Sequence, residues 1–450
     1  MDNTFNTVLP FVDFIYVLQL NDYDSDNYWN WVKKRFLKRG FQKVGRIDWT
    51  IKAKTLLGVS LGLYVIVALI LSSLMNNFLW VLISIAATTY GIPLIVLAAN
   101  LAFTPIDAWL KRDTITKAKI KLKRMEHCVV VAISGSFGKA STRLFSKSLI
   151  QNYAICHTPP QNHNTLYSLA QDILTNLKPD TTVYIVEVGE FYKGDLAKMH
   201  QMLRPDIVVL TSVGSQHISQ LGSQIAIDQE FTEFMNLAAD HKLLNGEDPG
   251  VVRVMANINK PNTRYFSYNL DLYHKKDALP EVLLPLHMQQ NAAGAVCITE
   301  TLGLKHEQIA KELKNLPHIE RRMDISHHNG ITIIDDTYNI NPESAKAALD
   351  HLATYKGRKI LVTGGIVDQG EHEAKANILF GTLIARVADH AVIAQNRLAS
   401  YLKEGIHASQ ADVDISLSDS PDETPQILRQ LLKAGDTVLL QNELTDLYWN

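Results

Sequence analysis

The pattern of apolar and polar positions divides the chain into two parts of different kinds. Two apolar runs without a charged residue come first, 20 residues from Leu56 to Met75 and 26 residues from Phe78 to Phe103. Beyond residue 126, short apolar runs rich in β-branched residues alternate with longer amphipathic stretches. The first pattern is typical of helices that cross a membrane, and the second is typical of α/β domains built on a parallel sheet.

Each long apolar run is sufficient to cross about 30 Å of hydrocarbon as one helix. A signal peptide does not fit, because the runs begin far from the N-terminus and a second run follows the first. Nine Lys or Arg residues lie between positions 33 and 54 and seven between 111 and 124, whereas the connection at Asn76 and Asn77 carries none. The positive-inside rule therefore predicts a two-helix hairpin with both flanks in the cytoplasm.

Residues 27–41 precede the first apolar run and have a helical pattern. One face carries apolar side chains and the other carries three lysines; the apolar residues are Tyr28, Trp29, Val32, Phe36 and Leu37. This pattern predicts a helix that lies on an anionic membrane surface. The alternative is a solvated helix that docks on the protein.

The remainder of the chain contains two series of strand-like runs. The first series predicts a parallel sheet with strands at Cys128–Ile133, Thr182–Val188 and Ile207–Val213. The second series predicts a separate, smaller Rossmann-like domain beginning near Pro317, with strands at 331–334, 359–362, 390–394 and 437–440.

At about 150 residues per globular domain, the 450 residues predict two or three units, and the patterns divide the chain into five segments. They are a cytoplasmic segment with an interfacial amphipathic helix (1–54), a transmembrane hairpin (55–104), a basic linker (105–126), a central nucleotide-binding domain (127–316) and a C-terminal domain (317–450). Charge differs between the parts, since the first 126 residues carry 16 Lys/Arg and 9 Asp/Glu whereas the rest carries 28 and 37. Three scattered cysteines show no metal-binding or disulfide spacing, which fits a reducing compartment.

A glycine-containing stretch, Val129–Leu144, carries the first chemical signal. A strand-like run leads into Gly135, Ser136 and Gly138, and Lys139 opens a helical pattern. Two glycines let backbone N–H groups surround an anion, and the helix N-terminus and Lys139 add positive charge, so the stretch predicts a phosphate-binding loop. The general P-loop pattern is not met, because Ile133 holds the position of its first glycine and Ala140 follows the lysine. An ordinary strand, turn and helix junction is the alternative.

Two further polar residues follow the next strands. Glu187 ends the second strand-like run and His217 lies just past the third. The carboxyl ends of parallel strands share one edge with the phosphate loop, so these side chains are placed to meet a metal ion on nucleotide phosphates. A structural histidine is the alternative for His217.

The order of several motifs resembles the Mur ligase family. The motifs are SGSFGKAST, PPQNHNTLYSLAQDIL, VEVGEFYKGDLAKM, RPDIVVLTSVGSQHISQLGS, LLNGEDP, HMQQNAAGA, RRM, IIDDTYNINPESAKAAL and GGIVDQGE. The resemblance is strong over residues 129–371 and weak over the last 80 residues. Within the family, the motifs are most similar to those of members that add D-alanyl-D-alanine to the peptidoglycan precursor.

The resemblance implies an α/β fold with a P-loop central domain and an ATP-dependent amide ligase that uses ATP and Mg²⁺. It activates a carboxylate as an acyl phosphate, which an amine then attacks, and electrostatics and positioning supply most of the catalysis. The residues carried over by motif are Lys139 on the phosphates; Ser141, Glu187 and His217 on Mg²⁺; Asn245 and Asn291 near the nucleoside; Arg322 and Asp336 reaching ATP from the last domain; and Asn162, Asn164, Asn339 and Asn341 on the substrate side. Turn formation is the alternative for the last two.

The chain also departs from the family pattern. Ala140 stands where members usually have Thr or Ser, so Ser141 is the expected Mg²⁺ ligand. Phe231 stands where a carbamylated lysine is expected, and no lysine lies between His217 and His241. Gln441, Asn442 and Glu443 replace a Lys-Gly-Ser run, and the membrane hairpin replaces the domain that binds the UDP-sugar.

The sequence thus predicts a membrane-anchored, two-helix multi-pass ligase of cell-wall precursor synthesis, with its catalytic domains in the cytoplasm. The expected partners are a peptidoglycan precursor, D-alanyl-D-alanine or another amine, membrane lipids and membrane-bound cell-wall synthesis enzymes, with no nucleic acid. Two alternatives stay open at this point. One is a ligase acting on a lipid-linked muropeptide or a poly-glutamate chain, and the other is an ATP-binding scaffold without turnover.

Overall fold

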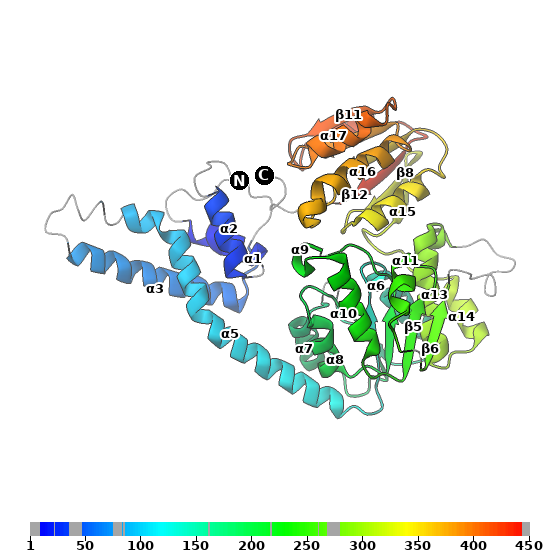
Figure 1. Cartoon of the computed structure of the whole chain (residues 1–450), viewed down its shortest axis with the longest axis horizontal. Coiled ribbons are helices and arrows are strands. Elements are labelled where there is room, and N and C mark those ends of the chain that lie inside the picture. The colour runs from blue at the N-terminus through cyan, green and yellow to red at the C-terminus, as the bar shows by residue number, and fades with distance from the viewer. Residues whose placement is uncertain are drawn as a thin grey trace. The chain divides into compact units, whose positions relative to one another are not determined.

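The computed structural model describes residues 10–21, 23–35, 47–74, 83, 86–160, 163–216, 218–259, 261–267 and 280–442. The chain divides into two compact units, a smaller one that includes Met1–Asp113 and a larger one, Thr114–Glu443 (Figure 1). Each unit has its own hydrophobic core.

The N-terminal unit is built from helices. These are α1 (Phe11–Leu20), α2 (Ser25–Arg35), α3 (Ile51–Ser73) and the first part of α5 (Ile92–Lys123). Helix α1 is apolar on nearly all sides and contributes buried side chains to this unit's core, among them the fully buried Ile15, Val17 and Leu18. The sequence pattern had not predicted this buried helix.

Helices α3 and α5 are long and apolar enough to cross a membrane by length and composition. Large apolar side chains of α3 stay exposed, including Val65, Ile66 and Leu69. Residues 86–90 are helical and Gly91 forms a turn before α5 begins. The predicted hairpin tip at Asn76 and Asn77 lies outside the described residues, so membrane insertion stays a prediction.

Helix α2 covers part of the predicted amphipathic segment. Tyr28 and Val32 are buried in the core of the unit, and the Tyr28 hydroxyl donates a hydrogen bond to the carbonyl of Pro93 at 3.1 Å. Phe36 and Leu37 lie outside the described residues. The contacts of Tyr28 and Val32 fit the docked-helix alternative, because these two side chains face protein.

The central domain of the larger unit is a six-stranded, fully parallel sheet in the order β2-β3-β1-β4-β5-β6. The strands are β1 (Val129–Ser134), β2 (Cys156–His157), β3 (Val183–Glu187), β4 (Ile207–Leu210), β5 (His241–Asn245) and β6 (Thr263–Phe266). The three predicted strands are confirmed as β1, β3 and β4. Strand order reverses around β1, and ligands of open α/β sheets bind at such a switch point.

Helices cover both faces of this sheet. They are α6 (Lys139–Ile150), α7 (Leu166–Thr175), α8 (Asp195–Leu203), α9 (Ile218–Leu221), α10 (Gln224–Asn236), α11 (Pro249–Met255), α13 (Leu286–Thr301) and α14 (His306–Leu313), with a short 3-10 helix η1 (Glu281–Leu283). Val131 and Ile133 point into the core on the α6 and α13 face, whereas Val130 and Ala132 point into the core on the α8 and α10 face. The apolar run of β1 is continuous because both of its faces are buried.

The C-terminal domain has a second six-stranded sheet, in the order β11-β10-β9-β12-β8-β7. Its strands are β7 (Asp324–His328), β8 (Ile331–Asp336), β9 (Lys359–Thr363), β10 (His390–Ala394), β11 (Asp414–Ser418) and β12 (Thr437–Gln441). Its helices are α15 (Pro342–Leu352), η2 (Gly370–His372), α16 (Glu373–Ala385), α17 (Ala399–Ala408) and α18 (Thr424–Leu431). All four predicted strands are present, and β7 adds an antiparallel edge.

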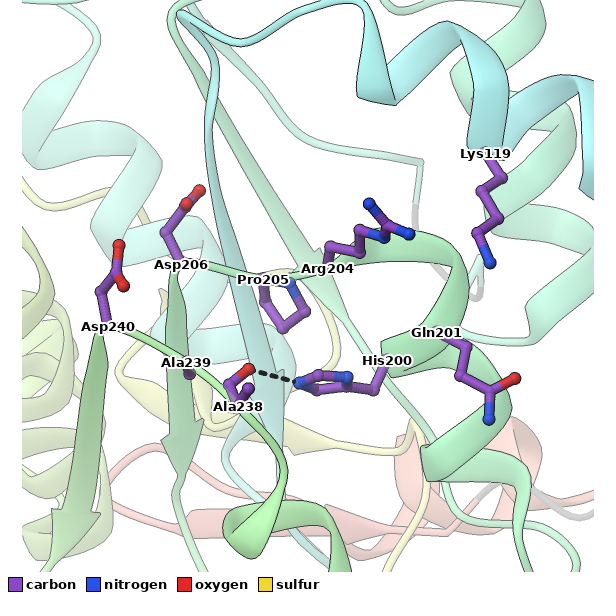
Figure 2. Close-up of a pocket in the computed structure, with 9 residues that line it drawn as sticks. All are labelled: Lys119, His200, Gln201, Arg204, Pro205, Asp206, Ala238, Ala239 and Asp240. Carbon is purple, nitrogen blue, oxygen red and sulfur yellow. Dashed lines mark hydrogen bonds between the residues drawn. The ribbon is translucent and has the colours of Figure 1, made fainter. Parts of the chain in front are cut away.

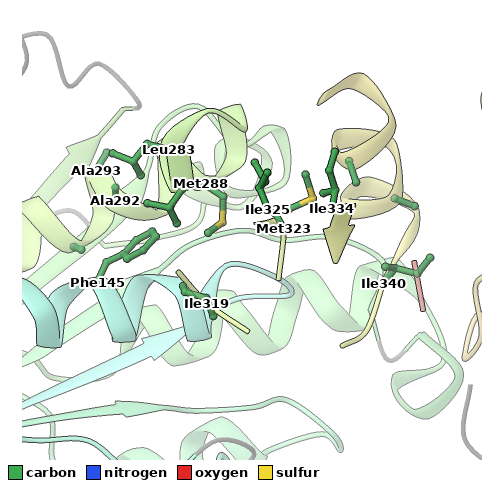
Figure 3. Packing of buried hydrophobic residues seen from close by; sticks show 14 of the residues in the cluster. Phe145, Leu283, Met288, Ala292, Ala293, Ile319, Met323, Ile325, Ile334 and Ile340 are labelled. Carbon is green, nitrogen blue, oxygen red and sulfur yellow. The ribbon is translucent and has the colours of Figure 1, made fainter. Parts of the chain in front are cut away.

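A continuous apolar cluster runs through the larger unit (Figure 3). It extends from Phe145 and Met288 in the central domain, through Ile319 in the connection after α14, to Ile334 and Ile340 in the C-terminal domain. The connection between α14 and β7 contains the boundary predicted near Pro317.

Candidate functional site

The loop after β1 has the backbone conformation that a phosphate cradle needs. Gly135 and Gly138 have φ values of +138° and +83°, where side chains are disfavoured. A Cβ added at Gly135 would overlap the Thr211 hydroxyl, and one at Gly138 would overlap the amide oxygen of Asn291. Helix α6 begins directly afterwards at Lys139, so its first N–H groups, which lack acceptors within the helix, face the loop.

Lys139 is buried against this loop. Its ammonium group donates to the carbonyl of Gly135 and lies 3.6 Å from a carboxylate oxygen of Glu190. The positive charge is therefore held where the terminal phosphates of a nucleotide would meet the loop.

Glu187 ends β3 on the same edge and forms an ion pair with Arg143. Arg143 Nε lies 2.7 Å from Glu187 Oε1, and the guanidinium also donates to the carbonyl of Pro159. Arg143 was not among the residues predicted from sequence. The available signal was its spacing, because positions four apart on a helix share a face and Arg143 follows Lys139 by four.

Glu190 was also not identified from sequence. Its side chain is fully buried, and burial raises its pKa while the nearby Lys139 opposes that shift. Glu190 follows Glu187, a predicted Mg²⁺ ligand, by three residues.

The predicted acceptor loop lies next to this stretch. The carbonyl of Asn164 accepts a hydrogen bond from Gly189 N at 3.0 Å. Asn162 and His217 lie outside the described residues, so their predicted roles stay predictions.

Asn245 and Asn291 flank the phosphate loop. Asn245 is buried, donates to the carbonyl of Thr211 at 2.9 Å and accepts from Glu247 N at 3.1 Å. Asn291 lies on α13 against Gly138. Ser141 is buried in the first turn of α6, two residues after Lys139. These positions are compatible with the predicted nucleotide site.

Arg322 and Asp336 lie close together in the C-terminal domain. The Arg322 guanidinium stacks on the Tyr338 ring, 4.0 Å from its centroid. Burial raises the pKa of Asp336 to about 7, opposed by Gln441, whose amide nitrogen lies 3.4 Å from Asp336 Oδ2, and by the charge of Arg322. The backbone around Arg322 is strained, because its two neighbours, Arg321 and Met323, have φ values of +61° and +51°.

The two asparagines of the NINP turn have different surroundings. Asn339 is exposed. Asn341 is buried and caps α15, because its side-chain oxygen accepts from Ser344 N at 2.8 Å. A structural role, the alternative from sequence, therefore accounts for the Asn341 side chain.

The position of the expected carbamylated lysine is part of the core. Phe231 is fully buried in the cluster beneath α8 and α10. Asp228 is held by Arg253 through contacts of 2.6 and 2.8 Å, and Glu230 accepts from Gly194 N and Leu196 N. These neighbouring carboxylates are already engaged within the domain.

A separate pocket opens at the opposite edge of the central sheet (Figure 2). It encloses about 600 Å³ and is lined in part by Lys119, Arg204, Asp206 and Asp240. Asp206 and Asp240 directly precede β4 and β5, so the pocket lies at the amino ends of the strands. It is therefore distinct from the phosphate loop at the carboxyl ends.

The residues around the loop fit ATP and Mg²⁺. The loop offers a glycine turn, a helix N-terminus and a lysine for phosphates. Ser141, Glu187 and Glu190 offer oxygen atoms, which Mg²⁺ prefers as ligands.

Comparisons with known proteins agree with this geometry. Residues 133–282 match the Mur ligase middle domain, and residues 321–441 match the Mur ligase glutamate ligase domain. The UDP-N-acetylmuramoyl-tripeptide--D-alanyl-D-alanine ligase of Mycobacterium tuberculosis is 27% identical over 358 residues, covering 69% of this chain and 70% of the relative. The Bacillus subtilis enzyme of the same name is 24% identical over 338 residues, covering 69% and 72%.

Solved structures share the fold. The MurF ligase of Thermotoga maritima in complex with ADP superposes with a TM-score of 0.64 at 23% identity, covering 74% of this chain and 80% of that chain. MurF of Acinetobacter baumannii gives a TM-score of 0.64 at 19% identity, covering 74% and 77%. The matched family consists of ATP-dependent ligases that form amide bonds and use ATP and Mg²⁺. The chain carries both domains in order on the predicted fold, and it therefore belongs to the Mur ligase family.

Proposed function

We propose that this ligase joins D-alanyl-D-alanine to the peptide carboxylate of a peptidoglycan precursor at the cytoplasmic face of the cell membrane. The observation that carries the proposal is the glycine loop with the buried Lys139, which lies beside Glu187 and the loop that contains Asn164. The relatives with similar sequences are named as D-alanyl-D-alanine ligases. The reaction class is shared by the family, and the substrates are the proposed part.

The chemistry proceeds in two balanced steps. A carboxylate oxygen of the precursor attacks the γ-phosphorus of ATP, the bond to ADP breaks, and an acyl phosphate forms. The neutral amine of D-alanyl-D-alanine then attacks the acyl carbon, inorganic phosphate leaves, and the amine proton passes to solvent. Each product molecule therefore accompanies one ADP and one phosphate.

Residues of the chain position and stabilise these groups. Lys139 and the N-terminus of α6 bind the β- and γ-phosphates and neutralise charge on the transferring group. Arg143 orients Glu187 through the 2.7 Å ion pair. Mg²⁺ held by Ser141, Glu187 and His217 would add charge neutralisation at the phosphates. In the C-terminal domain, Arg322 and Asp336 are the proposed contacts to ATP.

Apolar helices α3 and α5 support membrane anchoring. Both meet the length and composition of a membrane span, and α3 leaves large apolar side chains exposed. Cysteine labelling from outside intact cells tests the topology. A cysteine placed at Asn77 should react and one at Lys119 should not, and the reverse pattern would reject the hairpin.

A lipid-linked acceptor is the second candidate, and the same two helices favour it. A lipid-linked precursor is confined to the bilayer, so an anchored enzyme meets it at a higher effective concentration than a freely diffusing precursor. The test compares kcat/KM of the full chain in vesicles on UDP-linked and lipid-linked precursors. Use of only the UDP-linked form would reject this candidate, and failure of D-alanyl-D-alanine with both forms would reject the proposed amine.

A further inference from the structure

Glu190 has an environment that the proposed reaction does not yet explain. Its side chain is fully buried, and neither carboxylate oxygen has a hydrogen-bond partner among the described residues. The nearest cation is the Lys139 ammonium, 3.6 Å from Oε2, which is too long for a hydrogen bond. This carboxylate therefore lies beside the phosphate loop with open coordination sites.

A buried carboxylate in this state destabilises the fold. Removing a charged group from water without hydrogen bonds is costly, and native proteins satisfy nearly all such groups with protein, water or ions. The surroundings of Glu190 therefore indicate a ligand that supplies positive charge.

The other carboxylates near this loop already have partners. Glu187 pairs with Arg143 at 2.7 Å, and Asp228 pairs with Arg253. Glu230 accepts two backbone hydrogen bonds at the start of α8, from Gly194 N at 2.8 Å and Leu196 N at 3.1 Å. Of these four carboxylates, Glu190 is the one with both oxygens open.

The backbone around Glu190 is held in place. Val188 N donates to the carbonyl of Ile133 at 2.9 Å, and Gly189 N donates to the carbonyl of Asn164 at 3.0 Å. The first contact ties this stretch to β1, and the second ties it to the predicted acceptor loop. Glu190 is thereby fixed between the phosphate loop and the side from which the carboxylate substrate is expected.

We propose that Glu190 is a ligand for a divalent cation that enters with the nucleotide. Carboxylate oxygens suit Mg²⁺, which commonly bridges one or two carboxylates and the phosphates. With nucleotide bound, Lys139 would neutralise the phosphates, and Glu190 would supply carboxylate oxygens to the cation that accompanies them. The inference requires nucleotide binding but does not depend on the identity of the acceptor or the amine.

Metal binding can be measured without turnover. The full chain in detergent micelles is titrated with Mn²⁺ in the presence of the non-hydrolysable analogue AMP-PNP, and free Mn²⁺ is followed by electron paramagnetic resonance. Loss of a group that only orients a metal ligand costs about 10- to 100-fold in affinity, so Glu190→Gln should weaken Mn²⁺ binding at least about tenfold. Asp228→Asn is the matched control and should leave it unchanged.

Two outcomes would overturn the proposal. If the Glu190→Gln variant binds Mn²⁺ with wild-type affinity when AMP-PNP is bound, Glu190 is only a counter-ion for Lys139. If Asp228→Asn loses as much Mn²⁺ affinity as Glu190→Gln, the loss is not specific to Glu190. If Glu190→Gln does not fold, Glu190→Asp provides the test, because it keeps the charge and shortens the arm. It should weaken Mn²⁺ binding but preserve metal-free AMP-PNP binding, and unchanged Mn²⁺ affinity would again reject the ligand role.

Discussion

Two carboxylates end parallel strands in the two domains of the larger unit, and they are held differently. Glu187, at the end of β3, forms a 2.7 Å ion pair with Arg143. Asp336, at the end of β8, has the amide nitrogen of Gln441 at 3.4 Å, and burial raises its pKa to about 7. Carboxylates at the carboxyl ends of the two sheets therefore have different partners, a guanidinium group at Glu187 and an amide group at Asp336.

The nearby Arg322 opposes the rise in the pKa of Asp336 without cancelling it, so burial has the larger effect on this carboxyl group. An opposite charge within a few ångströms favours the ionised form, whereas burial alone favours the protonated form. The central domain keeps a dense set of opposite charges around its phosphate loop. The C-terminal domain instead presents a carboxyl group that takes up a proton near neutral pH.

The largest expected effect comes from removing the cation of the phosphate loop. Lys139→Ala should reduce ADP formation about 100-fold or more, because loss of one electrostatic contact to the transition state commonly costs that much. Lys147→Ala, on the same helix, is the control and should retain activity. More than about a tenth of wild-type turnover in Lys139→Ala would contradict the phosphate-loop assignment.

The second largest effect is expected from breaking the ion pair between Arg143 and Glu187, and it concerns the stability of the fold. Arg143→Met leaves Glu187 buried and unpaired, which should cost about 3 to 5 kcal/mol, measured by unfolding of the larger unit. The double variant with Glu187→Leu should recover much of this loss, because removal of both charges is close to neutral. Equal destabilisation of the single and double variants would show that the pairing is unimportant.

Asp336 should make stability depend on pH. Its folded pKa, about 7, lies above its unfolded value of 3.8, so the folded state binds more protons between these limits. The contribution of Asp336 to stability is full below about pH 4 and is lost as the pH rises to 7. Asp336→Asn should remove this decline in thermal melts, whereas the exposed Asp350→Asn should not. A decline that persists unchanged in Asp336→Asn would contradict the raised pKa.

The smallest expected effect is that of bicarbonate. No lysine lies between His217 and His241, and Phe231 fills the expected position in the core. Turnover in carbon-dioxide-free buffer should therefore be unchanged when bicarbonate is added. Stimulation by bicarbonate would reveal a carbamylated residue elsewhere in the chain.

Much of the fold could be predicted because buried parallel strands produce continuous apolar runs. This signal located β1, β3 and β4 and the four predicted strands of the C-terminal sheet. It failed for β2, which has two residues, and for β6, where Arg264 and Tyr265 are exposed. Helix α1 was missed because its ten residues, eight of them apolar, are too few to suggest a membrane span and show no continuous polar face.

The roles of the site residues stay predictions. Local sequence carries the glycine and lysine spacing of the loop and the place of Glu187 at the end of a strand. Local sequence does not carry the contacts of Arg143 and Glu190, because they join a helix to loops that are distant in sequence. The helix cap formed by Asn341 is local, because it joins Asn341 to Ser344, but the sequence analysis left this residue between turn formation and a substrate role.

The most direct test of the account follows oxygen from the acceptor carboxylate. The full chain is supplied with ATP, Mg²⁺, D-alanyl-D-alanine and a precursor whose peptide carboxylate carries ¹⁸O. The account predicts an amide product, an equal amount of ADP, and inorganic phosphate that carries ¹⁸O from the carboxylate. ADP formation that yields unlabelled phosphate, or that proceeds without an amide product when D-alanyl-D-alanine is present, would contradict carboxylate activation at this site.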